Sequence, residues 1–363
     1  MKINGRHTRT IWLNADGWSL TVIDQTKLPH RFATLTLDSM TAAAQAIKTM
    51  TVRGAPLIGA TAAYGLCLAL REDASDEALE RAYHVLIETR PTAINLKWAL
   101  DEMMAGLRNI PRTERVAAAY ARAGQICDQD VEICRRIGEN GLALIRAVAA
   151  KKPGQRVNVL THCNAGWLAC IDWGTALAPI YMAHDAGIPV HVFVDETRPR
   201  NQGASLTAYE LGAHGVPHTI LADNAGGHFM QAGQVDLCIV GTDRVTANGD
   251  VANKIGTYLK ALAAKDNGVP FYVALPHTTI DWTMPKGVGV IPIEERSAAE
   301  VLTMSGRLAD GSVAVVEIAA PGSPAANPGF DVTPARLVTA FITERGVAPA
   351  TAEGLLSLYP ERR

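Results

Sequence analysis

The sequence of 363 residues lacks an excess of charge of either sign. It has 34 basic and 36 acidic residues, and its formal net charge is -2. A broad nucleic-acid-binding surface needs a clear basic excess, so we expect no nucleic-acid partner. A small phosphate pocket is compatible with this balance, because it needs only a few well-placed cations.

The chain also lacks long hydrophobic runs. No stretch is long enough to span a bilayer, and residues 1–7 lack the apolar segment of a signal peptide. We therefore expect a cytoplasmic protein without a membrane partner. Hydrophobic residues make up 48% of the chain and charged residues 19%, which is typical of a compact folded protein.

Several signatures of familiar enzyme classes are missing as well. The six cysteines show no C-x-x-C pair and no metal-ligand spacing, so we expect them to be reduced and mostly buried. There is no G-x-G-x-x-G loop, no G-x-x-x-x-G-K-[ST] loop and no G-x-S-x-G elbow. These absences disfavour a nicotinamide oxidoreductase, a nucleotide triphosphatase and a serine hydrolase.

The front part of the chain, residues 1–127, is predicted to be a smaller, mostly helical domain. Short β-prone runs at 10–13 and 19–23 flank Asn14-Ala15-Asp16-Gly17, a pattern typical of a β-hairpin. Helical patterns follow at 39–50, 57–70, 75–90, 92–107 and 113–136.

Residues 128–363 are predicted to be a Rossmann-like α/β catalytic domain. Strand-like runs alternate with helical stretches, which indicates a parallel sheet covered by helices. The runs are 157–160, 190–194, 219–221, 237–240 and 271–275, and the helical stretches are 174–186, 203–213, 227–232 and 253–264. We expect 276–330 to form an excursion from the sheet and 333–344 a closing helix, with Gly346 just beyond it.

Polar and reactive residues follow several of these strands. They lie at 161–166, 195–199, 241–243 and 276–279. Open α/β sheets bind ligands beyond the carboxyl ends of their strands, so we expect the functional site there.

Asp243 stands at one such strand end. Asn253 and Lys254 are expected to open a helix whose amino terminus faces this acid, which places a proton-transfer group beside an anion site. The alternative, a turn-capping Asp243 and a solvent-exposed Lys254, explains this stretch equally well.

Cys163 stands at another strand end, ahead of Gly166 and an expected helix. A thiol near a helix amino terminus gains thiolate character, which suits a nucleophile or a base, although a structural buried cysteine is the commoner case. His162 is not expected to pair with it, because neighbouring residues on a strand point to opposite faces.

Two arginines in the front domain are candidates for a phosphate grip. Arg53, Gly54 and Ala55 precede a helix, and Arg90 lies at the end of another. An ordinary helix-terminal arginine is the alternative for each. Gln202 opens a further helix near the expected site.

Five motifs, taken in order, resemble the methylthioribose-1-phosphate isomerase family, in the superfamily that includes the regulatory subunits of translation initiation factor 2B. The resemblance covers nearly the whole chain. The motifs are Arg53-Gly54-Ala55-Pro56, Arg90-Pro91-Thr92-Ala93, Thr161-His162-Cys163-Asn164-Ala165-Gly166, Asp195-Glu196-Thr197-Arg198-Pro199 and Asn248-Gly249-Asp250-Val251-Ala252-Asn253-Lys254.

The resemblance implies a homodimeric aldose–ketose isomerase of 5-methylthioribose 1-phosphate that uses no metal and no organic cofactor. It implies that Cys163 and Asp243 are the catalytic pair. A protonated Asp243, its pKa raised by desolvation, would supply the sugar ring oxygen with a proton. Cys163 would remove the proton from carbon 2, or would support a hydride shift. The implied substrate contacts are Arg53, Gly54, Ala55, Arg90, Gln202, Asn253 and Lys254.

The chain departs from the family pattern at five positions. Ser205 stands where the family usually has arginine, and Trp167, Cys170, Trp173 and His277 are larger or chemically different from the expected residues. These departures keep two alternatives open. One is an isomerase of 5-deoxyribose 1-phosphate or another 5-modified pentose 1-phosphate, and the other is a non-catalytic regulatory protein that binds sugar phosphates.

Overall fold

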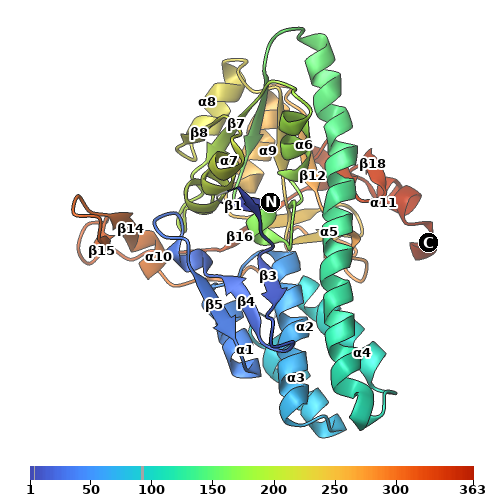
Figure 1. Cartoon of the computed structure of the whole chain (residues 1–363). Coiled ribbons are helices and arrows are strands. Elements are labelled where there is room, and N and C mark those ends of the chain that lie inside the picture. Colours follow the sequence, from blue (N-terminus) through green and yellow to red (C-terminus); the bar gives the residue numbers. More distant parts are fainter. Residues whose placement is uncertain (4, 91–93) are drawn as a thin grey trace.

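A computed structural model describes residues 1–3, 5–90 and 94–363. Figure 1 shows a helical front part and an α/β part, with the 40-residue helix α5 (Arg112–Lys151) running along both. The expected domain boundary after residue 127 falls inside this helix, and the division itself stays a prediction. Within the described ranges, no helix combines the length and apolar character needed to cross a membrane.

The front part contains the predicted hairpin and helices. Strand β3 (Ile11–Leu13) pairs antiparallel with β4 (Leu20–Ile23), and an unpredicted third strand, β5 (Thr34–Leu37), pairs with β4. The helices are α1 (Met40–Lys48), α2 (Ala55–Glu72), α3 (Asp76–Ile87) and α4 (Ile94–Leu107). Pro91, Thr92 and Ala93, part of one quoted motif, lie outside the described residues.

A seven-stranded sheet forms the centre of the second part, in the order β18-β17-β12-β9-β6-β7-β8. All five predicted strands are present and parallel, which confirms the Rossmann-like prediction. They are β6 (Val157–Thr161), β7 (Val190–Asp195), β8 (His218–Leu221), β9 (Leu237–Val240) and β12 (Phe271–Ala274). The inner strands β6, β7, β9 and β12 are largely apolar and mostly buried, whereas the edge strand β8 has two exposed residues.

The helices of this part are shorter than or shifted from the expected ranges. Residues 174–177 are not helical, and α6 covers only Ala178–Asp185. A π-helical turn (Gly203–Thr207) leads into α7 (Ala208–His214), and α8 spans Ala225–Gln231.

The prediction of a helix over 253–264 is wrong at its start. Asn253 and Lys254 belong to strand β11 (Val251–Lys254), and helix α9 (Thr257–Asp266) begins only after Gly256, whose φ is 101°. β11 lies between β10 (Arg244–Thr246) and β16 (Phe330–Thr333) in a four-stranded sheet with β13 (Ile280–Asp281). The partner β16 comes from far along the chain, so a local pattern could not indicate this pairing.

The predicted closing helix over 333–344 is also wrong. This stretch ends β16 and continues into β17 (Ala340–Thr343), which joins the main sheet beside β12 and turns back as β18 (Gly346–Pro349). All four β17 residues are buried, and a short apolar run of this kind fits a core strand as well as a helix.

The predicted excursion from the sheet carries several small elements. The hairpin β14 (Thr303–Arg307) and β15 (Val313–Glu317) projects from the body beside the short helix α10 (Ala299–Leu302) (Figure 1). The chain ends with helix α11 (Ala352–Leu358), near the β18 edge.

Candidate active site

Two neighbouring cavities lie beyond the carboxyl ends of β6 and β9. Cys163 and Asp243 line the first together with Arg53, Gly54 and Asn253. The second shares Ala55 and Asp243 with the first and is also lined by Arg90. Both cavities are small, with about 30 Å³ of free space each. The structure thus brings both predicted catalytic residues and most predicted contacts together.

The backbone of Cys163 is held in a left-handed conformation, with φ at 63°. Its N–H donates to Thr197 Oγ1 at 2.8 Å, and its carbonyl accepts from Thr207 Oγ1 at 2.7 Å. This conformation is uncommon for a residue other than glycine and is often found at functional sites, where surrounding bonds enforce it.

The expected helix amino terminus next to Cys163 is absent. The segment after Gly166 is only the 3-10 turn η2 (Trp167–Ala169). Burial raises the pKa of the Cys163 thiol, and the nearby charges of Arg53 and Lys254 oppose this rise. Two cations therefore replace the expected helix dipole as the groups that favour the thiolate.

Asp243 follows β9, and its N–H donates to the Ala252 carbonyl at 3.0 Å. Desolvation by burial raises the pKa of its carboxyl, in the expected direction. The charges of Lys254, Arg90 and Arg53 work against this rise. The site therefore holds a half-buried acid and a buried thiol near the same cations.

Arg53 is fixed by the loop that carries Cys163. Its Nη1 donates to Asn164 Oδ1 and its Nη2 donates to the Asn164 carbonyl at 2.8 Å. The next residue, Gly54, has a φ of 91°, and a Cβ there would overlap the backbone of Ala169. Glycine is required at this position for both reasons.

Lys254 is buried, contrary to the solvent-exposed alternative. Its Nζ donates to the Gly329 carbonyl at 2.7 Å and lies 4.7 Å from the centre of the Phe330 ring. Burial lowers the pKa of Lys254, while Cys163 and Asp243 oppose that change. Lys254 therefore belongs to strand β11, and not to the helix amino terminus that was expected.

Asn253, Arg90 and Gln202 are the remaining predicted contacts, and each has its own surroundings. Asn253 Nδ2 donates to Thr257 Oγ1 at 3.1 Å, and Arg90 Nη2 lies 3.6 Å from Glu294 Oε2. Gln202 does not line the Cys163 cavity. It lines a larger cavity of about 830 Å³, which Arg53 also reaches.

His162 does not pair with Cys163, in agreement with the strand argument. Its Nδ1 lies 3.0 Å from Asp195 Oδ2 and its Nε2 lies 2.8 Å from the Ile255 carbonyl. Lys260 Nζ lies 3.3 Å from the same Asp195 oxygen. This buried triad fixes the strand ends around the site.

Sequence reasoning missed Glu210, a buried residue of α7. Its carboxylate accepts from the Trp167 N–H at 2.6 Å, from the Tyr181 hydroxyl at 2.9 Å, and from Asn164 Nδ2. Because Asn164 also holds Arg53, Glu210 positions the arginine through the amide. Burial raises the pKa of Glu210 to about 7. A single acid inside a helical pattern gives no signal of this role.

Of the five departures from the family pattern, only Cys170 lines the Cys163 cavity. Ser205 lines the larger cavity, and Trp167 is packed in the core of the sheet domain. His277 Nδ1 lies 3.1 Å from Glu344 Oε1.

The fold and the site define an α/β protein with a half-buried acid, a buried thiol and several cations at the carboxyl ends of its parallel strands. Residues 51–350 match the model of the initiation factor 2 subunit family. A methylthioribose-1-phosphate isomerase of Methylorubrum populi is 67% identical, and the match covers 100% of this chain and 99% of that protein. The protein of the same name in Sinorhizobium medicae is 64% identical, with 100% of both chains covered.

Solved structures agree with these matches. The 5-methylthioribose 1-phosphate isomerase of Pyrococcus horikoshii OT3 has a TM-score of 0.83 at 39% identity, over 98% of this chain and 97% of that one. The translation initiation factor eIF-2B subunit delta of A. fulgidus has a TM-score of 0.79 at 36% identity, over 98% and 100%. The chain belongs to the initiation factor 2 subunit family and, within it, to the methylthioribose-1-phosphate isomerases.

Proposed function

We propose that this protein is an aldose–ketose isomerase that converts 5-methylthioribose 1-phosphate into 5-methylthioribulose 1-phosphate. One observation carries the proposal: Cys163 and Asp243 line a single cavity with Arg53 and Asn253, in a chain that matches named isomerases over its whole length. An acid, a base and cations for a phosphate are the groups that isomerisation of a sugar phosphate needs.

The first chemical step opens the sugar ring. Phosphate on the anomeric oxygen prevents spontaneous opening to an aldehyde, so the ring oxygen must take up a proton as its bond to carbon 1 breaks. Asp243 donates this proton. Burial favours the protonated form of its carboxyl, which supports this role.

The second step moves hydrogen from carbon 2 to carbon 1. The Cys163 thiolate removes the proton from carbon 2, and the electron pair forms a double bond between carbons 1 and 2. The thiol then returns its proton to carbon 1, while the hydroxyl on carbon 2 gives its proton to the Asp243 carboxylate and becomes the ketone. The charges of Arg53 and Lys254 stabilise the thiolate.

The phosphate binds to the cations around these two groups. The Asp243 carboxyl lies near the positive charges of Arg53, Arg90 and Lys254. Asn253 lines the cavity that contains Cys163 and Asp243. The backbone of Gly54 and Ala55 begins the 18-residue helix α2, whose amino terminus favours an anion. Gln202 contacts the substrate from the adjoining larger cavity.

The group on carbon 5 separates this proposal from its nearest alternative. Purified protein is incubated with 5-methylthioribose 1-phosphate and, separately, with 5-deoxyribose 1-phosphate. The rate of ketose formation from each substrate is measured by NMR. We expect the methylthio substrate to have the higher kcat/KM. A higher value for the deoxy substrate would assign the chain to that reaction.

The likeness to the A. fulgidus protein keeps one further candidate, a regulatory protein that binds sugar phosphates without turnover. The presence of both Cys163 and Asp243 in one cavity argues against it. Calorimetric binding of both sugar phosphates with no conversion of either would favour this candidate.

The family resemblance also supports a homodimer in the cytoplasm, where sugar phosphates occur. Light scattering after size-exclusion chromatography tests the assembly. We expect about twice the 38.7 kDa of one chain, and a monomeric mass would contradict the dimer.

A further inference from the structure

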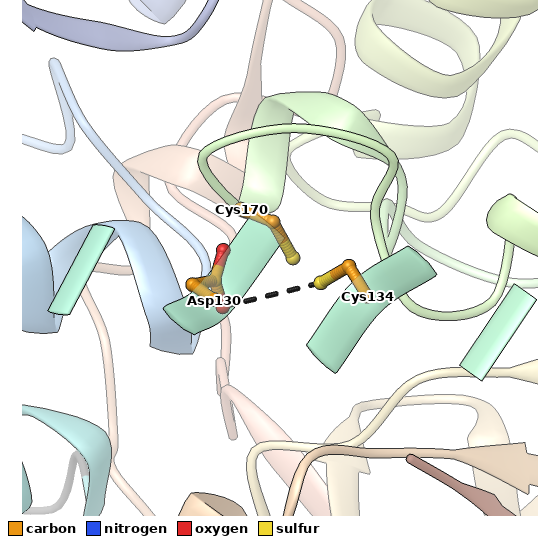
Figure 2. A group of neighbouring side chains, drawn as sticks. All are labelled: Asp130, Cys134 and Cys170. Atoms are coloured by element: carbon orange, nitrogen blue, oxygen red, sulfur yellow. Dashed lines mark hydrogen bonds between the residues drawn. The ribbon is translucent and has the colours of Figure 1, made fainter. Parts of the chain in front are cut away.

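Asp130, Cys134 and Cys170 form a buried cluster outside the proposed reaction. Figure 2 shows their side chains converging, two from helix α5 and one from the segment that follows η2. One ligand atom from each residue lies within 4.8 Å of the others. Asp130 and Cys134 are four residues apart, so they share one face of the helix.

We propose that this cluster binds a thiophilic divalent cation of the zinc class. Zinc bonds to thiolate sulfur at about 2.3 Å and to carboxylate oxygen at about 2.0–2.2 Å. Cys134 Sγ lies 3.9 Å from Asp130 Oδ1, so one ion between them can reach both atoms at these lengths. The Cys170 sulfur supplies the third ligand.

The carboxylate is already oriented for this task. Asp130 Oδ2 accepts from the Ile171 N–H at 3.0 Å, which leaves Oδ1 directed at Cys134. A second hydrogen bond of this kind commonly fixes a ligating side chain. Cys170 and Ile171 are consecutive, so one short segment supplies both a ligand and the group that orients another.

Asp130 has no direct cationic partner among the ion pairs of the described residues. The neighbouring Asp172 carboxylate is itself paired with the Met1 ammonium and with His7. Zinc binds the deprotonated forms of cysteine and aspartate, so binding at this cluster would release protons.

A second group of potential ligands shows the contrast. His162, Asp195 and Asp223 also converge, but Lys260 Nζ lies 3.3 Å from Asp195 Oδ2 and donates to the Asp223 carbonyl. The Lys260 ammonium therefore lies where a metal ion would have to bind in that group.

A cation at this cluster would join α5 to the segment behind the candidate active site. Cys170 lines the Cys163 cavity, and the preceding Ala169 packs against Gly54. We expect the ion to stiffen this segment. The proposal depends on the cluster geometry alone, so it stands or fails separately from the isomerase proposal.

Cobalt titration tests the site. Protein reduced and freed of metal is titrated with Co²⁺, and thiolate-to-cobalt absorption in the near ultraviolet is recorded. We expect one equivalent to bind, Zn²⁺ to displace it, and Zn²⁺ to raise Tm. Cys134→Ser and Cys170→Ser should each weaken Co²⁺ binding at least about tenfold. Cys127→Ser, another buried thiol on α5, should leave it unchanged.

Alkylation of the native chain gives a readout that does not depend on folding of the variants. Zn²⁺ should protect Cys134 and Cys170 from iodoacetamide during slow partial unfolding in urea, as mapped by mass spectrometry, and should not protect Cys127. The proposal is overturned by absence of thiolate-to-cobalt absorption, by absorption that persists in both serine variants, or by a Cys134–Cys170 disulfide in protein purified without reductant.

Discussion

The protein buries two thiol–carboxyl groups of similar composition in opposite electrostatic surroundings. Cys163 and Asp243 lie within the field of Arg53, Arg90 and Lys254. The cluster of Asp130, Cys134 and Cys170 lies beside Asp172, without an ion pair to Asp130 among the described residues. Burial raises the pKa in both groups. Two cations, Arg53 and Lys254, lower the pKa of Cys163, whereas no cation lowers that of Cys134 and only Arg53 lowers that of Cys170.

This difference separates two chemical roles for the same side chains. In the first group, burial raises the pKa of an acid and of a thiol, and neighbouring cations oppose both rises, which fits the proposed proton-transfer roles. In the second group, the charges near Cys134 are those of Asp130, Asp172 and the Cys170 thiol, and all of them raise the pKa of Cys134. A bound cation would reverse the sign of this effect. The surrounding charges decide the role, and not the residue types.

The largest expected effect comes from removing either member of the first group. Cys163→Ser and Asp243→Asn should each lower kcat at least about a hundredfold, because each removes a proton-transfer group. Asp130→Asn should lower it less than about tenfold and should act mainly on cobalt binding. Steady-state kinetics with 5-methylthioribose 1-phosphate gives the three values, and circular dichroism checks the fold.

A different ranking of these kcat losses would contradict the distinction between the two groups. Near-normal turnover in Cys163→Ser or Asp243→Asn would remove that residue from the mechanism. Loss of turnover in folded Asp130→Asn equal to that in Asp243→Asn would show that the second group takes part in catalysis.

Much of this arrangement could be predicted from the sequence, because it depends on local patterns. Short apolar runs gave the five parallel strands, and the strand-end rule placed Cys163 and Asp243 at one edge of the sheet. Strand β11 could not be predicted, because its partner β16 is remote in sequence. Glu210 and the Asp130 cluster were missed for a related reason: their partners meet only in the folded chain.

The charge of Lys254 is expected to act on the pKa of the Cys163 thiol. Lys254→Met keeps the length of the side chain but removes a charge that lowers the pKa of Cys163. The thiol pKa should rise, and at a fixed pH below that pKa the alkylation rate should fall about tenfold for each unit of rise. Iodoacetamide kinetics across pH 7–10 measures the change. An unchanged profile would mean that Lys254 does not act on the thiol.

A smaller effect is expected from Glu210, which positions Arg53 through Asn164. Glu210→Gln should raise KM several-fold with little change in kcat, and it should cost about 1–3 kcal/mol of stability because buried polar groups lose partners. Tyr181→Phe removes only one of these bonds and is the matched control, with a cost of about 1 kcal/mol. Equal KM values in the wild type and Glu210→Gln would refute the positioning role.

The smallest effect concerns stability and pH. The folded-state pKa values of Glu210 and Asp130 are both raised to about 7, so each carboxyl binds a proton more tightly in the folded chain. Their contribution to stability is complete in acid, below the unfolded pKa values, and is lost as the pH rises through 7. Urea unfolding should therefore show the free energy of unfolding falling between pH 5 and pH 8, by about 2–3 kcal/mol for each of the two carboxyls.

Glu210→Gln and Asp130→Asn should each flatten this slope. A steeper fall in either variant than in the wild type would assign the pH dependence to other groups.

Selective modification of the native protein tests the central claim most directly. The metal-free enzyme is treated with less than one equivalent of iodoacetamide at pH 8, and residual activity is compared with the modified fraction of every cysteine by mass spectrometry. The account predicts that Cys163 reacts first, that activity falls in proportion to its modification, and that 5-methylthioribose 1-phosphate protects it. Activity that stays constant while the modified fraction of Cys163 rises would contradict the account.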